Sequence, residues 1–376
     1  MNGKVYYIGF YADDQVKGDL VYFPTSIPKM RYLIDVIKKL GFKVEVVSLC
    51  RAKRKFNKTI ISIDDCEKHK YFSSKNNKFK KYNYMRDQIA VFFYLLKHLR
   101  KNDIVIVYHS LWNYCWLKWI RIFKRCKFIF EVEEIYNDVV KTGFFNRKKE
   151  MKSVLPADAY IFPTHLLNGI VNVKNKPYVL LHGIYENIKL NGDKKTKGKI
   201  KVVYGGTLEP RKGCLDLVEA CRFLNDKYDV GIVGFGSVQE INILVDKISK
   251  IKEEIACELH YDGNLNNLEY LRYIQDCDIG ICPQDPDAAF NATSFPSKIL
   301  SYMANGLRVV SIRIPAIESS AIGDYMYYYD RQTPEAIAKA IMQVDLNDGY
   351  NGREIISKLD KKFTKEIAEL INEVGE

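Results

Sequence analysis

The sequence has no CxxC pair and no regular cysteine spacing, although it contains nine cysteines. Zinc sites and disulfide frameworks show such spacing, so we expect buried thiols in a reducing compartment. The chain also lacks an apolar run near the 18 residues of a membrane-spanning helix, the best being the short amphipathic segment 89–96. It opens directly on a predicted strand, and no signal peptide is visible.

A GxGxxG motif is missing after that first strand, 4–9, which weakens a dinucleotide-binding interpretation. What the sequence does have is length, since 376 residues exceed one ordinary core and predict two domains. A strand, a helix and a second strand over 4–49 predict a parallel sheet, and the same pattern restarts at residue 201. We therefore predict an α/β protein whose polar linker begins at residue 186.

Charge is divided unevenly along the chain. Residues 1–185 hold 34 Lys and Arg against 16 Asp and Glu, a net charge of +18, and the remaining 24 and 30 give residues 186–376 a net charge of −6. The basic half suits nucleic acid, anionic lipid or a phosphorylated ligand. Its basic segments 51–58 and 68–81 are predicted to be exposed loops.

Two features of the first half invite a functional interpretation. His109 follows the predicted strand 103–108, and Glu131 begins a group of three carboxylates at the end of the next strand. The carboxyl ends of parallel strands are where such sheets bind ligands. A hydrogen-bonded structural histidine and solvated carboxylates would give the same pattern.

All three tryptophans, Trp112, Trp116 and Trp119, recur at helical spacing within 110–125, interleaved with lysine and arginine. A helix that buries an aromatic stripe on the sheet explains this spacing. A helix lying on a membrane surface, with its cations outward, explains it as well.

The second half offers an anion site. Glycine turns follow two predicted strands, at 205–207 and 234–236, and Lys212 lies near the first turn. Glycine lets the backbone approach a diphosphate closely, and lysine adds a positive charge. Farther on, a predicted helix beginning at Pro296 carries Ser297, Lys298 and Ser301 on its polar face, which suits an anion but equally an ordinary capped helix.

The segments 205–213 (GGTLEPRKG), 234–236 (GFG), 276–278 (DCD) and 295–306 (FPSKILSYMANG) resemble the nucleotide-sugar domain of the group 1 (family four) glycosyltransferases. Segments 108–110 (YHS), 157–159 (ADA) and 182–184 (HGI) are looser landmarks of the same family. The resemblance implies the GT-B fold, in which two Rossmann-like domains face each other across a cleft. It places an acceptor domain at 1–185, joined by a final helix at about 353–376, and a donor domain at 186–352.

The resemblance also implies roles for individual residues. Lys212 would stabilise the departing diphosphate, His109 would contact the transferred sugar, and Glu131 is a further catalytic candidate. The predicted donor-binding residues are Gly206, Thr207, Arg211, Lys212, Gly236, Asn264, Leu265, Ser294, Phe295, Pro296, Ser297, Lys298 and Ser301. The predicted acceptor-binding residues are Asp13, Thr25 and Ser26.

This sequence departs from the family pattern at three positions. Thr207 stands where arginine is common, and Thr293 and Ser301 replace two glutamates, the second of which holds the ribose hydroxyls. Ser301 can still hydrogen-bond a ribose, as a neutral partner. Glu209, Arg211 and Arg308 are candidates to compensate.

The expected function is that of a retaining, metal-independent glycosyltransferase of bacterial surface-polysaccharide synthesis (O-antigen, capsule or exopolysaccharide). It would need no cofactor and would use a UDP- or GDP-linked sugar and a lipid-linked acceptor at the cytoplasmic face of the inner membrane. Nucleic acid is not an expected partner, because no binding module is recognised. A catalytically inactive scaffold of the same fold and a nucleotide-sugar epimerase are the alternatives.

Overall fold

The protein is described here by a computed structural model covering residues 3–56, 59–75, 78–110, 116–137, 144–188 and 198–375. The chain forms two compact units, Met1–Leu181 with Lys362–Glu376, and His182–Lys361. The boundary predicted between residues 185 and 186 lies four residues from this division. The predicted final helix is α13 (Gly352–Gly375), and its residues from Lys362 onward belong to the first unit.

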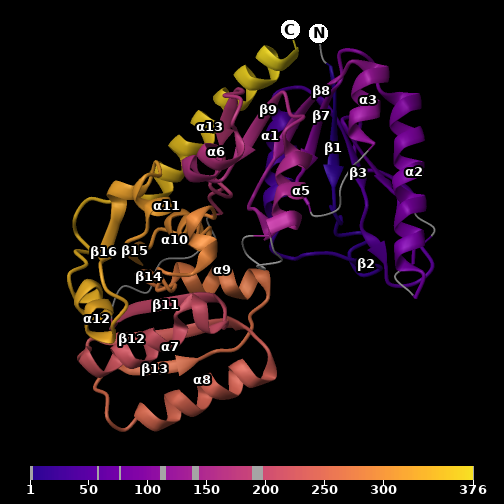
Figure 1. The fold of residues 1–376 in the computed structure, drawn as a ribbon. Helices are drawn as coiled ribbons and strands as arrows, with labels where there is room; N and C mark the ends of the chain where they lie inside the picture. The colour runs from indigo at the N-terminus through magenta and orange to yellow at the C-terminus, as the bar shows by residue number, and fades with distance from the viewer. Residues whose placement is uncertain are drawn as a thin grey trace. The chain divides into compact units, whose positions relative to one another are not determined.

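The first unit is built on an eight-stranded sheet with the order β10-β9-β8-β7-β1-β3-β6-β5 (Figure 1). All neighbouring strands are parallel except β5 and β6. The strands are β1 (Lys4–Gly9), β3 (Lys43–Ser48), β5 (Ile60–Ser62), β6 (Glu67–Tyr71), β7 (Ile104–Tyr108), β8 (Lys127–Glu131), β9 (Ala159–Phe162) and β10 (Tyr178–Leu180). Strands β2 (Leu20–Val21) and β4 (Arg51–Ala52) form a separate antiparallel pair.

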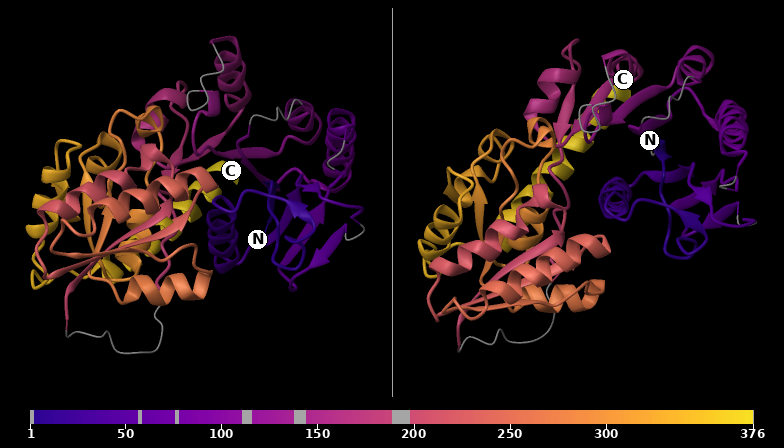
Figure 2. Two further views of the ribbon diagram at one scale, coloured as in Figure 1. Left: turned by 90° about the horizontal axis from the view of Figure 1, so that it is seen from below. Right: turned by 60° about the horizontal axis from the view of Figure 1, so that its bottom comes forward.

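Helices cover both faces of this sheet, as Figure 2 shows. Helix α1 (Ile27–Lys39) follows β1 and lies on one face of the sheet. The connection from β1 to β3 runs toward the β5 edge, whereas the helical connections after β6 run toward the β10 edge, so right-handed crossovers place their helices on opposite faces. The other face carries α2 (Lys80–His98), α3 (Leu117–Lys124), α5 (Phe144–Val154) and α6 (His165–Val171). Tyr6 and Ile8 of β1 pack there with Val91 and Leu95 of α2, whereas Tyr7 points to the α1 face.

The prediction that the basic segments 51–58 and 68–81 are loops is wrong in part. Strand β4 opens the first segment, and most of β6 and the start of α2 lie within the second. Strand β6 alternates buried Glu67, His69 and Tyr71 with more exposed lysines. Glu67 is 1% exposed and pairs with Arg31, Lys38 (2.7 Å) and His69 (2.6 Å). A charged strand can thus be internal when cations from α1 neutralise it.

The second unit contains a six-stranded, fully parallel sheet with the order β13-β12-β11-β14-β15-β16. Its strands are β11 (Ile200–Thr207), β12 (Tyr228–Phe235), β13 (Glu258–Tyr261), β14 (Ile279–Cys282), β15 (Arg308–Ile312) and β16 (Met326–Tyr329). Its α-helices before α13 are α7 (Cys214–Ala220), α8 (Val238–Ile251), α9 (Asn267–Gln275), α10 (Lys298–Ala304), α11 (Pro315–Glu318) and α12 (Pro334–Met342). The strands predicted at 279–282 and 308–312 are confirmed.

Within the described residues, no helix combines the length and apolarity that crossing a bilayer requires. The eight cysteines that the structure describes are free thiols, and all but Cys66 are buried.

The Glu67 cluster generates a stability prediction. Burial alone would raise the pKa of Glu67, but hydrogen bonds from His69, Arg31 and Lys38 outweigh burial and hold the pKa below its ordinary range. Replacing Glu67→Gln removes the charge that these cations share, so we expect a loss of about 2 kcal/mol in the free energy of urea unfolding at pH 7. The depressed pKa contributes stability above the unfolded value, so this difference should shrink below about pH 4.5.

The matched control is Asp64→Asn, which removes an exposed carboxylate that also pairs with Lys38. It should leave the unfolding curve unchanged. Equal losses in the two variants would show that burial of Glu67 is not what matters.

Candidate functional site

The second sheet reverses its strand order between β11 and β14, which are neighbours. From β11 the chain passes through α7 to β12 on one side, and from β14 it passes through α10 to β15 on the other. Open α/β sheets bind ligands at such a reversal, beyond the carboxyl ends of the strands. The segments that meet this position are 208–213 and 283–297.

Glycines allow the backbone segments at this edge to approach one another closely. A Cβ added to Gly234 would lie 1.8 Å from the carbonyl oxygen of Gly206. Gly213 has φ +75°, and a Cβ there would lie 1.6 Å from the carbonyl oxygen of Pro283. No other residue fits either position, so the two turns found in the sequence form one packed edge.

Lys298 is the most unusual charge at this edge. Its Nζ atom is buried without a hydrogen-bond partner among the described residues, and lies 4.0 Å from the centroid of the Tyr204 ring. A Cβ added to Gly206 would lie 3.4 Å from this nitrogen, so the ammonium faces the first glycine turn. Burial, with a further contribution from the Lys212 charge, lowers the pKa of Lys298 to about 8. An ammonium in such a place is stabilised by an anionic ligand.

Lys212 ends the short 3-10 helix Pro210–Lys212, with its Nζ 3.8 Å from the centroid of the Phe290 ring. Its electrostatic effect on Lys298 shows that the two cations act on the same region. The predicted donor residues Gly206, Lys212 and Lys298 are therefore brought together.

The helix predicted to begin at Pro296 begins instead at Lys298, and α10 has only seven residues. Its N-cap is Ser297, whose side chain makes no capping hydrogen bond. Pro296 and Ser297 form a preliminary turn, in which the amide of Ile299 bonds to the carbonyl of Pro296 (3.1 Å). So short a helix supplies little dipole, and the two lysines provide most of the positive potential.

Ser301 reaches the first glycine turn through a tyrosine that the sequence analysis did not identify. Its side chain hydrogen-bonds Tyr270, whose hydroxyl lies 2.5 Å from where a Cβ on Gly205 would be. The hydroxyl of Tyr302 accepts a hydrogen bond from the amide of Gly205 (2.8 Å). The sequence around Tyr270 contains no pattern that predicts its hydrogen bond with Ser301.

The other predicted donor residues occupy loops around the same strand ends. Asn264 is exposed and Leu265 half-buried in the loop after β13, where the Gly263 carbonyl accepts from the Gly234 amide (2.8 Å). The Phe295 ring packs on His182, with 4.9 Å between centroids. Thr207, Gly236, Ser294 and Pro296 are half-buried, and Ser297 and Arg211 are exposed.

The proposed compensation by Arg308 is wrong. Its guanidinium is 8% exposed and binds the loop 345–350, donating to the Leu346 carbonyl (3.1 Å) and pairing with Asp348. Glu209 and Arg211 pair with each other at the surface. Neither of these two has an interaction that assigns it to a ribose.

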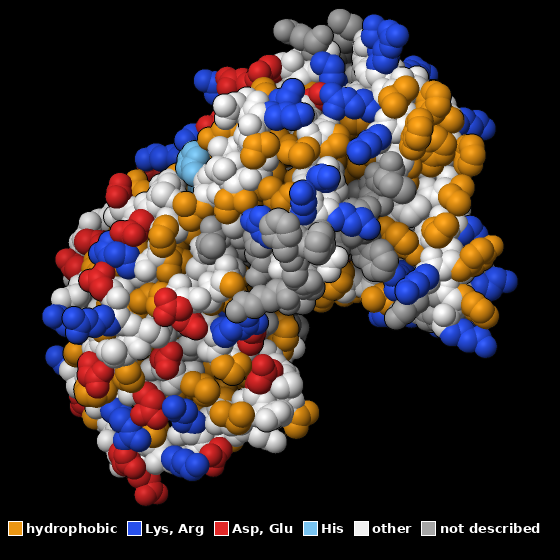
Figure 3. All heavy atoms as spheres, in the orientation of Figure 1, with side chains coloured by type: hydrophobic (Ala, Val, Ile, Leu, Met, Phe, Trp, Pro, Cys, Tyr) orange, Lys and Arg blue, Asp and Glu red, His pale blue; other side chains and the backbone are white. Residues whose placement is uncertain are grey.

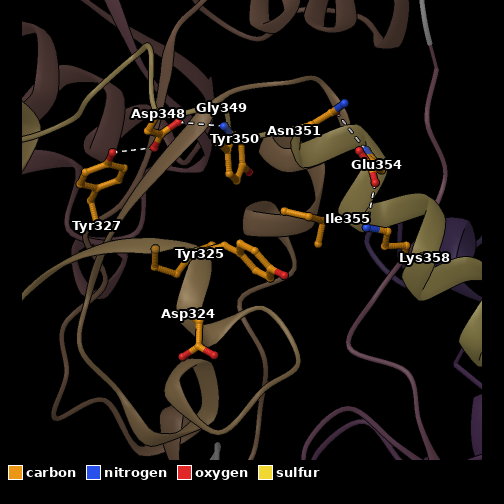
Figure 4. A pocket seen from close by; sticks show the side chains of 11 residues that line it. Asp324, Tyr325, Tyr327, Asp348, Gly349, Tyr350, Asn351, Glu354, Ile355 and Lys358 are labelled. Atoms are coloured by element: carbon orange, nitrogen blue, oxygen red, sulfur yellow. Dashed lines mark hydrogen bonds and ion pairs between the residues drawn. The ribbon is translucent and has the colours of Figure 1, made fainter.

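A separate pocket of about 440 Å³ lies between the end of the sheet and the start of α13 (Figure 4). Its polar groups bind one another: the Tyr327 hydroxyl donates to Asp348 (2.8 Å), and Lys358 pairs with Glu354 (2.7 Å). It contains none of the predicted donor residues.

In the first unit, the order reverses between β1 and β7, and His109 directly follows β7. His109 is 3% exposed and stacks on Tyr136, with 5.4 Å between ring centroids. Its Nε2 lies 3.4 Å from Glu150 Oε1, and the ring also interacts with the backbone of Glu134. Burial lowers the pKa of His109 to about 4, so the ring is neutral at pH 7.

Glu131 ends β8 on the α1 face of the sheet and is fully buried. It accepts a hydrogen bond from the Tyr7 hydroxyl (2.6 Å), and burial together with the charge of Glu133 raises its pKa to about 7. Glu133 pairs with Lys29 (2.7 Å), which also donates to the Leu181 carbonyl (2.7 Å). The sequence analysis missed Tyr7 and Lys29, which lie more than 100 residues from the carboxylates.

The predicted acceptor residues are less closely associated. Asp13 is half-buried, and its amide bonds to the Tyr71 hydroxyl (3.3 Å) near His69, whereas Thr25 is exposed. Ser26 precedes α1 and donates to the Phe23 carbonyl (3.1 Å) without capping the helix. No contact in the structure joins these three residues to His109 or Glu131.

Residues 199–347 match the family model described as "Glycosyl transferases group 1". Over these residues the second unit is similar to the group 1 glycosyltransferases. The match confirms the resemblance seen in the sequence and supports glycosyltransferase activity. No curated protein sequence matches the chain.

Solved structures similar to the whole chain share its fold at low sequence identity. They include sucrose-phosphate synthase from Thermosynechococcus elongatus (16% identity, 99% of each chain, TM-score 0.71). Anabaena HepE in complex with UDP is similar at 12% identity, over 98% of this chain and 100% of that chain, with a TM-score of 0.69. The catalytic domain of starch synthase IV from Arabidopsis thaliana, bound to ADP and acarbose, is similar at 10% identity over 100% of both chains (TM-score 0.67). The predicted GT-B fold of two Rossmann-like domains is confirmed.

Burial of the Lys298 charge predicts an unusual stability change. The pKa of Lys298 is lowered from 10.5 to about 8, which means that the folded protein binds this proton less tightly than the unfolded chain does. Carrying the proton therefore lowers the free energy of unfolding at pH values below about 8. Lys298→Met should therefore raise the free energy of unfolding at pH 7, by an amount on the order of 3 kcal/mol. The advantage should diminish between pH 8 and pH 10.5, as the wild-type lysine becomes neutral in both states.

Urea unfolding of both proteins at pH 7 and pH 10 measures this difference. If Lys298→Met is less stable than the wild type at pH 7, the ammonium has a stabilising partner within the protein, and the interpretation of Lys298 as an anion-binding group fails.

Proposed function

We propose that the protein transfers a sugar from a nucleotide-diphosphate sugar to an acceptor, and that the second unit binds the donor. The main observation behind this proposal is the buried ammonium of Lys298, which has no hydrogen-bond partner among the described residues. It faces the glycine turn at the point where the strand order reverses, within the residues that match the group 1 glycosyltransferase model. A diphosphate would place negative charge beside this ammonium. The base is uracil or guanine in this proposal, and Asn264 and Leu265 lie on the loop that would frame it.

Lys212 and Lys298 would act on charge that develops during transfer. When the glycosidic bond to the diphosphate breaks, negative charge accumulates on the leaving oxygen, and preorganised cations stabilise that state. Electrostatic stabilisation by two lysines needs no metal ion, which agrees with the expected metal-independent, retaining reaction. Ser301, held by Tyr270, is the proposed partner of the ribose.

His109 is suited to contact a sugar in the first unit. Because its ring is neutral at pH 7, one nitrogen can donate and the other accept a hydrogen bond. We propose that it contacts a hydroxyl of the transferred hexosyl group, while Asp13, Thr25 and Ser26 belong to the acceptor region. Glu131, with its pKa raised to about 7, is the proposed proton-exchanging carboxyl.

The acceptor in this proposal is a lipid-linked glycan of surface-polysaccharide synthesis, at the cytoplasmic face of the inner membrane. Support comes from the net charge of +18 in residues 1–185, since anionic membranes attract basic surfaces. The inactive-scaffold and epimerase alternatives remain outcomes of the tests below.

We predict that UDP or GDP raises the melting temperature of the protein and that uridine and guanosine do not, because the lysines recognise the diphosphate. In calorimetry, Lys298→Ala and Lys212→Ala should each weaken nucleotide binding about tenfold or more, as expected for loss of a hydrogen bond to a charged group. The control is Lys339→Ala, an exposed lysine of α12. Equal binding by all three variants would rule out the proposed site.

Affinity should also depend on pH. Since Lys298 loses its proton near pH 8 in the free protein, wild-type affinity for UDP or GDP should fall above that pH, and the fall should be absent in Lys298→Met. Nucleotide binding without turnover on any acceptor would favour the scaffold. Conversion of the free donor to an epimer would favour the epimerase.

A further inference from the structure

Helix α2 of the first unit presents a stripe of large apolar side chains to solvent. Tyr82, Met85, Ile89 and Phe93 are 69%, 66%, 53% and 61% exposed. Their spacing of three or four residues places them on one side of the helix. The opposite side of the helix, with Val91 and Leu95, is buried in the core. The exposed stripe therefore makes no contribution to that core.

Helix α3 continues the apolar surface beside α2. Trp119, Ile122 and Phe123 are 57%, 64% and 61% exposed, and the two helices pack against each other. Trp116 is 5% exposed and donates to Gln88 of α2, which ties the helices together. Figure 3 shows hydrophobic side chains gathered over these helices with lysine and arginine at their edges. We call this the α2–α3 surface: Tyr82, Met85, Ile89, Phe93, Trp119, Ile122 and Phe123.

The prediction of a single tryptophan stripe on a helix over 110–125 is therefore corrected. Trp116 and Trp119 point in different directions, α3 begins at Leu117, and Trp112 lies outside the described residues. Of the two tryptophans that the structure describes, Trp119 belongs to the exposed apolar surface and Trp116 does not, and α2 supplies the larger share of that surface.

The charges of these two helices are mainly positive. Four Lys and Arg in α2 and three in α3 stand against one acidic residue, Asp87. The Asp87 carboxylate accepts from the Ser74 amide (2.9 Å), so it is directed at the loop before α2. At 100° per residue, Lys81 flanks the apolar stripe on one side and Arg86 and Lys97 on the other. Lys118 adjoins Trp119 and is exposed.

We propose that the α2–α3 surface docks the first unit on an anionic lipid bilayer. Apolar side chains enter the boundary between headgroups and acyl chains, and the flanking cations attract anionic headgroups. A second copy of the chain fits less well, because a symmetric contact would bring cations of the same sign together. The purpose of docking rests on the proposed lipid-linked acceptor, but docking itself does not require a donor.

Two sets of substitutions separate the apolar and electrostatic contributions. The apolar variant is Met85→Gln with Ile89→Gln and Phe93→Gln, and the basic variant is Lys81→Gln with Lys97→Gln and Lys118→Gln. Arg121 is left intact, because it pairs with Asp158 and donates to the Pro156 carbonyl. The control is Ile243→Gln with Val245→Gln on α8, where both side chains are 45% exposed.

The test is cosedimentation of the full chain with vesicles of phosphatidylethanolamine and phosphatidylglycerol, or of phosphatidylcholine alone. We expect the wild type and the control to bind the anionic vesicles and to be released by salt. The apolar variant should lose at least tenfold in partitioning. The basic variant should lose about 100-fold at low salt.

Three results would overturn the proposal: a wild type that binds neither vesicle, variants that bind as the wild type does, or a wild-type dimer in sedimentation that the apolar variant dissociates. Circular dichroism and the nucleotide-induced thermal shift verify that the variants are folded. Vesicle binding without a nucleotide shift in the wild type would preserve docking and refute the donor site, and the reverse result would refute docking alone.

Discussion

The second unit depends on the burial of a positive charge, that of Lys298, for which the described residues supply no hydrogen-bond partner. The ammonium of Lys298 lies over Tyr204 and beside Gly206, where its protonated form is penalised. The glycine turns pack closely beside it, and a Cβ added to Gly206 would lie only 3.4 Å from the ammonium nitrogen. A site of this kind keeps part of its binding energy available for an anion, at the expense of stability without ligand.

The sequence predicts most of the second unit because most strands there are short apolar runs that end in a turn. The strands at 279–282 and 308–312 have the predicted bounds, and the glycine turns converge as parallel strand ends must. What the sequence could not supply were contacts made only in three dimensions. The hydrogen bond between Tyr270 and Ser301 is one such contact, and the binding of Arg308 to the loop 345–350 is another. No local sequence pattern encodes the packing that produces them.

The first unit is harder to predict because it contains buried charges that pair with residues distant in the sequence. Strand β6 resembles a solvated loop in composition, and only the cations of α1 make it an internal strand. In the same way Glu131 is recognisable as a strand end, but its partners Tyr7 and Lys29 come from distant elements. Hydrophobic periodicity describes the core of such a sheet, and it gives no information about ion pairs that replace apolar contacts.

Helix α13 determines which of the two units is synthesised completely first. Its residues from Lys362 onward belong to the first unit, where the Phe363 ring stacks on Tyr32 of α1 with 6.0 Å between centroids. The second unit is therefore an insertion within the first, both by sequence and by fold. The ribosome synthesises residues 1–181 of the first unit first and its residues 362–376 last. The first unit therefore cannot bury the end of α13 until the whole chain has been made. All residues of the second unit are therefore synthesised before residues 362–376, which complete the first unit.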